Sequence, residues 1–137
     1  MEKLKKEKKI LLIDDDEIYL TIAESILKDE YEVITAKSGE EAVEYLLTGV
    51  IPNLILLDII MPNMDGWGTF NKLKAISFLQ NVPIAFITSL YGAADKKQAF
   101  DMGAVDFIVK PYKQDDLLKR VKNIIDKKDT LPKPQSH

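Results

Sequence analysis

Short apolar runs alternate with longer segments of helical periodicity along the chain. Five runs end in polar or turn residues, at positions 9–14, 32–36, 53–58, 83–88 and 104–110. Four of them contain an almost uninterrupted hydrophobic core, ILLI, LILL, IAFI and FIV, which is typical of strands with helices on both faces. The pattern therefore predicts a parallel sheet that is buried on both sides.

The segments between these runs have the spacing of amphipathic helices. Apolar residues recur in the first two segments every three or four positions, at Ile18, Ile22, Ile26 and Leu27, and at Ala42, Val43, Leu46 and Leu47. Ser38 and Glu41 form a capping-box pattern, and Gly49 and Gly103 follow predicted helix ends. Five strand–helix repeats with short connections predict one three-layer α/β domain with right-handed crossovers.

Polar residues stand where four of the predicted strands end. The carboxyl ends of parallel strands point to one edge of the sheet, where ligands of open α/β sheets bind. We therefore expect these side chains to meet in one pocket: Asp14, Asp15 and Asp16, then Asp58, then Thr88 and Ser89, then Lys110 and Pro111.

The residue types in this predicted pocket suit phosphoryl transfer. The carboxylates of Asp14, Asp15 and Asp58 repel one another unless a cation compensates, and Mg²⁺ binds carboxylates while keeping sites open for water and phosphate. Asp58 supplies a carboxylate nucleophile, whereas Thr88 and Lys110 supply a hydroxyl donor and a cation for phosphoryl oxygens. Each residue alone has an ordinary structural explanation, so the prediction depends on their combination.

Neighbouring residues have simpler explanations. Asp16 is the best candidate to cap the first helix, Asp65 lies near the start of the third helix, and Gly66 is a candidate tight-turn residue. Tyr91 and Tyr112 lie just beyond the fourth and fifth strands, in loops that flank the predicted pocket. They are candidates for a partner surface.

Composition excludes several kinds of chemistry. The chain has no cysteine and its single histidine is the terminal His137, which excludes thiolate sites, imidazole catalysis and a histidine kinase. The net charge of −3 argues against direct DNA binding over the whole domain. The apolar run at 10–13 is too short for a signal peptide or a membrane span, so we expect a cytoplasmic protein without membrane insertion.

The two ends of the chain differ in composition from the domain between them. Residues 1–7 lie in the basic segment MEKLKKEKK, and residues 128–137 lie in KKDTLPKPQSH, which has two prolines and no hydrophobic period. Both ends are expected to be flexible, on either side of one domain at 8–127. The C-terminal segment also fits a truncated linker to an output domain.

Four segments, in this order and spacing, closely resemble the receiver domains of two-component response regulators: LLIDDD, LLDIIMPNMDG, FITS and FIVKP. The resemblance extends over residues 8–127 and implies a flavodoxin-like doubly wound sheet of order 2-1-3-4-5. It also implies a single-domain, Mg²⁺-dependent phosphoacceptor switch rather than an enzyme that acts on other substrates. A sensor histidine kinase or a histidine phosphotransfer protein would supply the phosphoryl group, and the downstream target is unknown.

Individual roles follow from the same resemblance, position by position. They comprise the phosphoacceptor Asp58, the metal ligands Asp14, Asp15, Asp58 and the backbone carbonyl of Ile60, the phosphoryl-binding Thr88 and Lys110, and the switch residues Thr88 and Phe107. The peptide bond between Lys110 and Pro111 is expected to be cis.

Three positions qualify what the resemblance implies. Phe107 stands where the family often has tyrosine, so the switch ring forms no hydroxyl hydrogen bond. Ile60 and Leu90, two positions after Asp58 and two after Thr88, are both apolar and flank the route of the attacking water in the family. We therefore predict slow autodephosphorylation.

Two other classes of function remain open. A haloacid-dehalogenase-like phosphatase also uses Asp, Thr or Ser, Lys and Mg²⁺, but Ile60 replaces the second Asp that it needs two residues after the nucleophile. A receiver fold used as an unphosphorylated docking module would not require the acidic pair, Thr88 and Lys110.

Overall fold

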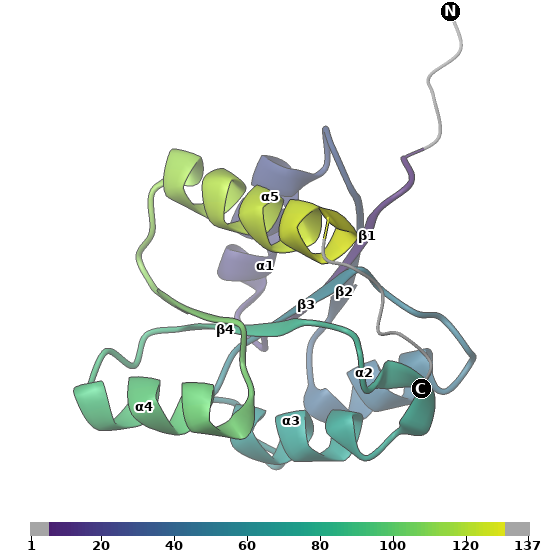
Figure 1. The fold of residues 1–137 in the computed structure, drawn as a ribbon. Helices are drawn as coiled ribbons and strands as arrows, with labels where there is room; N and C mark the ends of the chain where they lie inside the picture. Colours follow the sequence, from purple (N-terminus) through teal and green to yellow (C-terminus); the bar gives the residue numbers. More distant parts are fainter. Residues whose placement is uncertain (1–5, 131–137) are drawn as a thin grey trace, which may run out of the picture.

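A computed structural model describes residues 6–130 of the 137-residue chain, and these residues form a single parallel sheet covered by helices (Figure 1). The strand order is β2-β1-β3-β4-β5. The predicted fold class is therefore confirmed. The strands are β1 (Lys9–Ile13), β2 (Glu32–Ala36), β3 (Leu54–Leu57), β4 (Ile84–Thr88) and β5 (Asp106–Val109). The helices are α1 (Glu17–Leu27), α2 (Gly39–Leu46), α3 (Gly66–Lys74), α4 (Ala93–Met102) and α5 (Gln114–Thr130), with a 3₁₀ turn at Ser77–Leu79.

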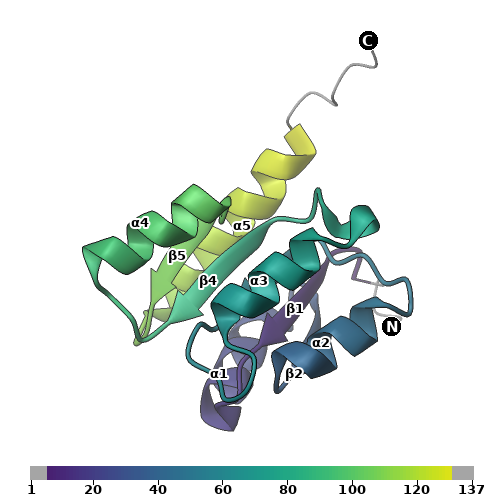
Figure 2. The same cartoon turned by 90° about the horizontal axis from the view of Figure 1, so that it is seen from below.

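Helices cover both faces of the sheet, as its uninterrupted apolar strands require. Figure 1 shows α1 and α5 on one face, and Figure 2 shows α2, α3 and α4 in front of the other. Each face has its own apolar cluster, because alternate residues of a strand point to opposite sides. Leu11 and Ile13 of β1 pack toward α2 and α3, whereas Ile10 and Leu12 pack toward α1 and α5.

Local hydrogen bonds place the helix ends where the sequence indicates them. The Asp16 carboxylate accepts from the backbone N–H of Ile18 at 2.9 Å and so caps α1, and Asp65 caps α3 through Gly68 at 2.9 Å. Ser38 caps α2 by accepting from Glu41 at 3.0 Å. The Glu41 carboxylate accepts from the N–H of Lys37 at 3.2 Å, one residue before the position that a reciprocal capping box uses.

The predicted apolar stripe of the first helix is wrong in part. Ile18 and Ile22 are 70% and 41% exposed, and α1 buries Leu20 and Ala23 in their place, together with the predicted Leu27. Both sets have helical spacing, so the period alone could not select the face that meets the sheet. Leu47, predicted as an inward residue of the second helix, is also exposed because α2 ends at Leu46.

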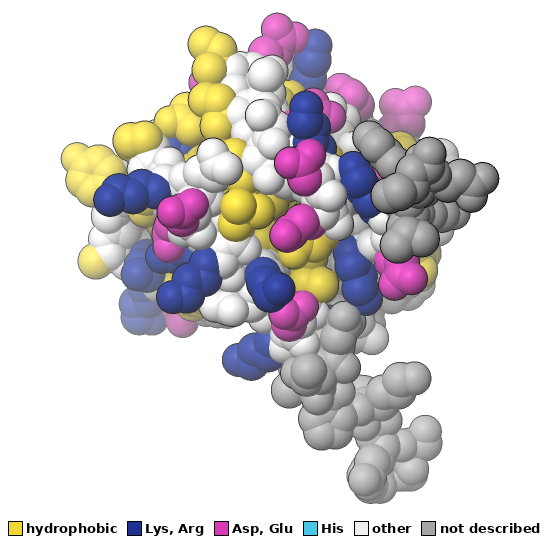
Figure 3. Space-filling view, turned by 90° about the horizontal axis from the view of Figure 1, so that it is seen from above, with side chains coloured by type: hydrophobic (Ala, Val, Ile, Leu, Met, Phe, Trp, Pro, Cys, Tyr) yellow, Lys and Arg dark blue, Asp and Glu magenta, His cyan; other side chains and the backbone are white. Residues whose placement is uncertain are grey.

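The C-terminal helix runs past the predicted domain boundary at residue 127, because α5 continues to Thr130. The rest of the predicted flexible segments, residues 1–5 and 131–137, lies outside the described residues. Within 6–130 no helix combines the length and hydrophobicity that a bilayer crossing requires. Figure 3 looks onto the face that carries α1 and α5, where basic and acidic side chains are interspersed.

Candidate phosphoryl-transfer site

Three carboxylates meet at the carboxyl ends of the central strands. Asp14 follows β1 and Asp58 follows β3, and these strands are paired neighbours in the middle of the sheet. Asp14 and Asp58 are buried, at 4% and 5% exposure, whereas Asp15 is exposed. One carboxylate oxygen from each of Asp14, Asp15 and Asp58 lies within 4.8 Å of the others, which is compatible with binding to one cation.

A backbone N–H group binds one oxygen of each buried carboxylate. The Asp14 Oδ1 atom accepts from the N–H of Asp16 at 2.9 Å, and the Asp58 Oδ1 atom accepts from the N–H of Ile59 at 2.8 Å. The second oxygen of each faces Lys110, whose Nζ lies 2.5 Å from Asp14 Oδ2 and 3.4 Å from Asp58 Oδ2. The Lys110 side chain is only 7% exposed, so its ammonium depends on these carboxylates rather than on bulk water.

The loop between Asp58 and α3 brings Gly66 close to the backbone of Asp58 and Ile59. Gly66 donates its N–H to the carbonyl of Ile59 at 2.8 Å, and a Cβ atom at Gly66 would overlap the carbonyl oxygen of Asp58. The interpretation of Gly66 as a tight-turn residue therefore needs correction, because this contact explains the glycine. The left-handed turn conformation in the loop belongs to Asn63, with φ 68°.

The electrostatic environment keeps Asp58 protonated up to a higher pH than usual. Burial and, after it, the negative charge of Asp14 raise the pKa of Asp58, whereas Lys110 and a hydrogen bond with Thr88 lower it, and the net result is a pKa of about 6. Three carboxylates face one ammonium, which leaves an excess of negative charge. These donors fit Mg²⁺, a hard cation that prefers carboxylate oxygens.

The fourth and fifth strands add the predicted hydroxyl and switch residues. Thr88 is fully buried, and its Oγ1 accepts from the N–H of Leu90 at 3.3 Å. Phe107 is already packed in the apolar cluster beneath α4, at 3% exposure. The ring therefore lies inside the domain in this structure, and the switch role expected for Phe107 stays a prediction. The peptide bond between Lys110 and Pro111 is cis, as expected.

A hollow of about 570 Å³ opens above these groups. Four of the predicted site residues line it, Asp15, Asp58, Ile60 and Lys110, whereas the buried Asp14, Thr88 and Phe107 do not. Ile60 stands at its rim with 54% exposure. The hollow is lined by Asp15, Asp16, Tyr19, Asp58, Ile60, Ser89, Lys110 and Pro111.

Two tyrosines differ from the sequence prediction. Tyr19 of α1 lines the hollow, and no sequence pattern singled it out, although it lies four residues after Asp15. Tyr112, a candidate for a partner surface, turns its hydroxyl inward, where it has no hydrogen-bond partner among the described residues. Tyr91 is 84% exposed and still fits the surface prediction.

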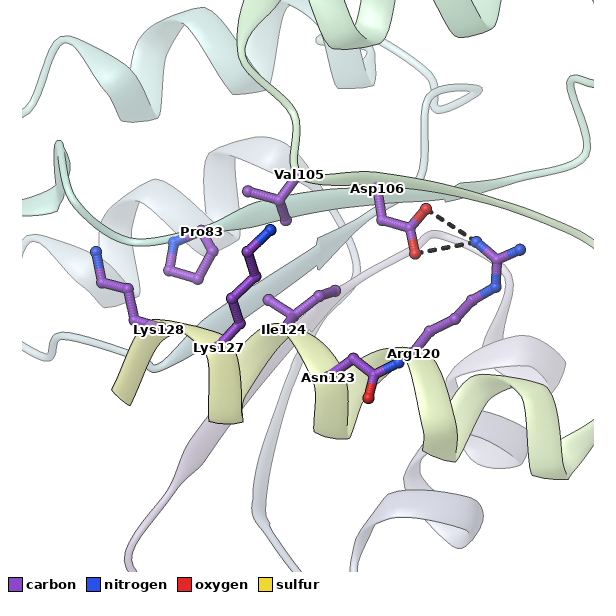
Figure 4. Close-up of a pocket in the computed structure, with 8 residues that line it drawn as sticks. All are labelled: Pro83, Val105, Asp106, Arg120, Asn123, Ile124, Lys127 and Lys128. Atoms are coloured by element: carbon purple, nitrogen blue, oxygen red, sulfur yellow. Dashed lines mark hydrogen bonds and ion pairs between the residues drawn. The ribbon is translucent and has the colours of Figure 1, made fainter. Parts of the chain in front are cut away.

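A second hollow of about 600 Å³ lies at the amino ends of β4 and β5, at the opposite end of the strands from Asp58 (Figure 4). Arg120 of α5 forms a two-point ion pair with Asp106 at its wall, at 2.8 and 3.0 Å. No carboxylate cluster of the kind found around Asp58 occurs there among residues 6–130. The remaining lining residues are Pro83, Val105, Asn123, Ile124, Lys127 and Lys128.

Comparisons with known proteins agree with this geometry. The family model for the response regulator receiver domain matches residues 10–122. A probable transcriptional regulator, ycf27 of Cyanophora paradoxa, is 37% identical over 120 residues, which cover 87% of this chain and 48% of the relative. The chain spans about half the length of the ycf27 relatives that it matches.

Solved structures show the same fold. A putative response regulator from Chloroflexus aurantiacus superposes with a TM-score of 0.82 at 30% identity, covering 88% of this chain and 99% of the other. The chemotaxis protein CheY4 of Vibrio cholerae superposes with a TM-score of 0.80 at 28% identity, covering 85% and 98%.

Proposed function

The chain belongs to the response regulator receiver domains, and on this premise we propose that Asp58 accepts a phosphoryl group and thereby switches partner binding. The observation that carries the proposal is the position of Asp58. Its buried carboxylate lies 3.4 Å from the Lys110 ammonium, beside two further carboxylates and at the floor of an open hollow. Family membership makes the domain a phosphoacceptor switch, and the identity of the acceptor is our inference.

The transfer step uses the ionised form of Asp58. A carboxylate oxygen attacks the phosphorus atom, the bond from phosphorus to the donor breaks, and the leaving group departs with the electron pair. Lys110 stays beside the developing negative charge, and the hydroxyl of Thr88 donates to a phosphoryl oxygen. The donor lies outside this domain in our proposal, since the single histidine of the given sequence is His137.

Asp14, Asp15, Asp58 and the backbone carbonyl of Ile60 would hold Mg²⁺. When bound, Mg²⁺ supplies positive charge that offsets the clustered carboxylates and the phosphoryl oxygens. Lys110, which contacts Asp14 and Asp58 in the structure, would pair with a phosphoryl oxygen through one of its three N–H groups.

Partner exchange follows from a change at Thr88. In the structure its Oγ1 accepts from the N–H of Leu90, so a turn of the hydroxyl toward a phosphoryl oxygen breaks that bond. The loop between β4 and α4 then moves, and it carries the exposed Tyr91. In our proposal the Phe107 ring, buried at 3% exposure in this structure, repacks together with this loop, as its predicted switch role requires.

The partners follow from the same chemistry. A cytoplasmic histidine kinase or histidine phosphotransfer protein donates the phosphoryl group, and a separate protein target receives the signal. A ycf27 relative is described as a probable transcriptional regulator, but the mixed charge on the face seen in Figure 3 gives this domain no continuous basic surface there for DNA. We therefore propose that the domain acts on a protein and contacts no DNA itself.

Phosphotransfer profiling tests the main proposal. Wild type and Asp58→Ala are incubated with candidate histidine kinases and with acetyl phosphate, with and without Mg²⁺, and covalent phosphate is measured by mass spectrometry. Wild type is expected to take up one phosphoryl group only with Mg²⁺, and Asp58→Ala none. Label on Asp58→Ala would place the acceptor elsewhere, and an unlabelled wild type would favour the docking-module alternative.

The lifetime of the phosphorylated state forms a separate proposal. Ile60 is apolar and 54% exposed at the rim of the hollow, and apolar Leu90 follows Thr88, so neither side chain orients a water molecule toward the phosphoryl group. We expect the label to persist well beyond seconds. The double variant Ile60→Asn with Leu90→Glu should lose it faster, as measured by following the intact phosphoprotein with time. Equal rates in both proteins would refute this explanation.

A further inference from the structure

The ammonium of Lys110 lies over the ring of Tyr19. Its Nζ is 4.3 Å from the ring centroid, within the range of a cation–π contact. Tyr19 belongs to α1 and lines the same hollow as Asp58 and Lys110. An aromatic ring therefore touches the cation that lies beside the proposed phosphoacceptor.

The ring completes the surroundings of this ammonium. Two of its neighbours are the Oδ2 atoms of Asp14 and Asp58, and the Tyr19 ring covers another side. The Lys110 side chain is 7% exposed, so little water reaches it. A cation–π contact is stronger when the cation is desolvated, and this contact meets that condition.

The ring of Tyr112 packs against the ring of Tyr19. The two tyrosine rings lie 6.0 Å apart at an angle of 53°, and the Tyr112 hydroxyl is buried. Tyr19, Tyr112 and Lys110 also line a cavity of about 10 Å³ beneath the site. This space holds at most about one water molecule, so the ring has no room to move away from Lys110 on that side.

We infer that Tyr19 is a positioning residue for phosphoryl transfer, acting through Lys110. Its ring keeps the ammonium dehydrated and close to Asp58, and the ammonium then meets the incoming phosphoryl oxygens without first losing water. The inference rests on the proposed function of Asp58. It assigns the effect to the aromatic face, so the hydroxyl of Tyr19 is dispensable.

Two substitutions separate the ring from the hydroxyl. Tyr19→Phe keeps the aromatic face, and Tyr19→Leu removes it while preserving an apolar side chain. With acetyl phosphate and saturating Mg²⁺, Tyr19→Phe should phosphorylate at the wild-type rate. Tyr19→Leu should lower the maximal rate by about 2- to 30-fold, the range expected for a partly or fully desolvated cation–π contact. Tyr45→Leu, on α2 across the sheet, is the matched control and should leave the rate unchanged.

Two further measurements distinguish positioning from damage to the pocket. Mg²⁺ affinity, followed by the fluorescence of the single tryptophan, Trp67, should be as high in Tyr19→Leu as in wild type, because the carboxylates are intact. The ε-methylene protons of Lys110 should show an upfield ring-current shift by NMR in wild type and Tyr19→Phe, and lose it in Tyr19→Leu. The NMR test on wild type holds even if a variant fails to fold.

Several outcomes would overturn the inference. These are a wild-type rate in Tyr19→Leu, an equal loss in Tyr19→Phe, a parallel loss of rate and Mg²⁺ affinity, or no ring-current shift at Lys110 in wild type. A wild type that takes up no phosphoryl group would instead contradict the function proposed for Asp58.

Discussion

Two ion pairs lie at opposite ends of the strands of the sheet, and they differ mainly in burial. Lys110 contacts Asp58 with both side chains 7% exposed, whereas Arg120 contacts Asp106 with side chains 38% and 22% exposed. The hollows beside them are of similar size, about 570 and 600 Å³. The volume of the hollow therefore does not distinguish the proposed phosphoryl-transfer site from the hollow beside Arg120.

Burial gives the two pairs different consequences. Around Asp58, loss of water and the neighbouring Asp14 raise the pKa to about 6, which leaves the carboxylates in need of a cation. In the Asp106–Arg120 pair one guanidinium nitrogen contacts both carboxylate oxygens, at 2.8 and 3.0 Å, but water screens these charges. The first pair therefore fits the proposed phosphoryl transfer, and the second links β5 to α5.

Removing the two cations should give the largest contrast between these regions. Lys110→Ala is expected to slow phosphorylation from acetyl phosphate roughly 100-fold, because a preorganised cation beside the developing charge is lost. Mg²⁺ affinity should not fall, since Lys110 competes with the metal for Asp14. Arg120→Ala should phosphorylate at the wild-type rate. Equal losses in both variants, measured under the same conditions, would contradict the comparison.

The pH dependence of stability should differ between wild type and Asp58→Asn in metal-free buffer. The pKa of Asp58 rises from an ordinary value of 3.8 to about 6 on folding, so the protonated form favours the native state. This contribution is complete below about pH 4 and is lost as the pH rises through about 6. At pH 7, Asp58→Asn should be more stable than wild type by on the order of 2 kcal/mol.

Urea denaturation at pH 4 and pH 7 with a chelator measures this difference. The gap between the two proteins should be present at pH 7 and close toward pH 4. Asp106→Asn is the matched control at the exposed pair and should show no comparable gain at pH 7. A constant gap for Asp58→Asn at both pH values would exclude ionisation of this carboxyl group as its cause.

The exposed pair should give the smallest effect. A double-mutant cycle with Arg120→Ala and Asp106→Asn is expected to yield a coupling free energy below about 1 kcal/mol, because both charges reach water. High salt should reduce it further. A coupling of several kcal/mol in thermal or urea unfolding would show that this pair is effectively buried, and the contrast with Lys110 would then fail.

Much of the fold was predictable because burial on both faces constrains every residue of a strand. The runs around ILLI and LILL permit few alternatives to a central parallel sheet, and their boundaries agree with the structure within two residues. The inward face of α1 was not predictable in the same way. Ile18 and Ile22 have helical spacing equal to that of the buried residues, and only packing against the sheet selects between them.

Part of the candidate site was also predictable from the sequence, and part was not. Asp14, Asp58 and Lys110 could be placed together because the ends of parallel strands share one edge. Tyr19 could not, because its contact with Lys110 depends on how α1 lies against β1 and β5, which a pattern along one helix does not encode. The reason for Gly66, a close approach to the backbone of Asp58, also becomes visible only when α3 is in place.

The sequence by itself determined the order of strands and helices and the chemical groups at the strand ends, because both follow from local periodicity and residue type. The tertiary structure decided how these groups behave. It buried Asp58 beside Asp14, directed one oxygen of each toward Lys110, and laid the Tyr19 ring against the ammonium. Such properties depend on distance and on the exclusion of water, which arise only when segments far apart in the chain are packed together.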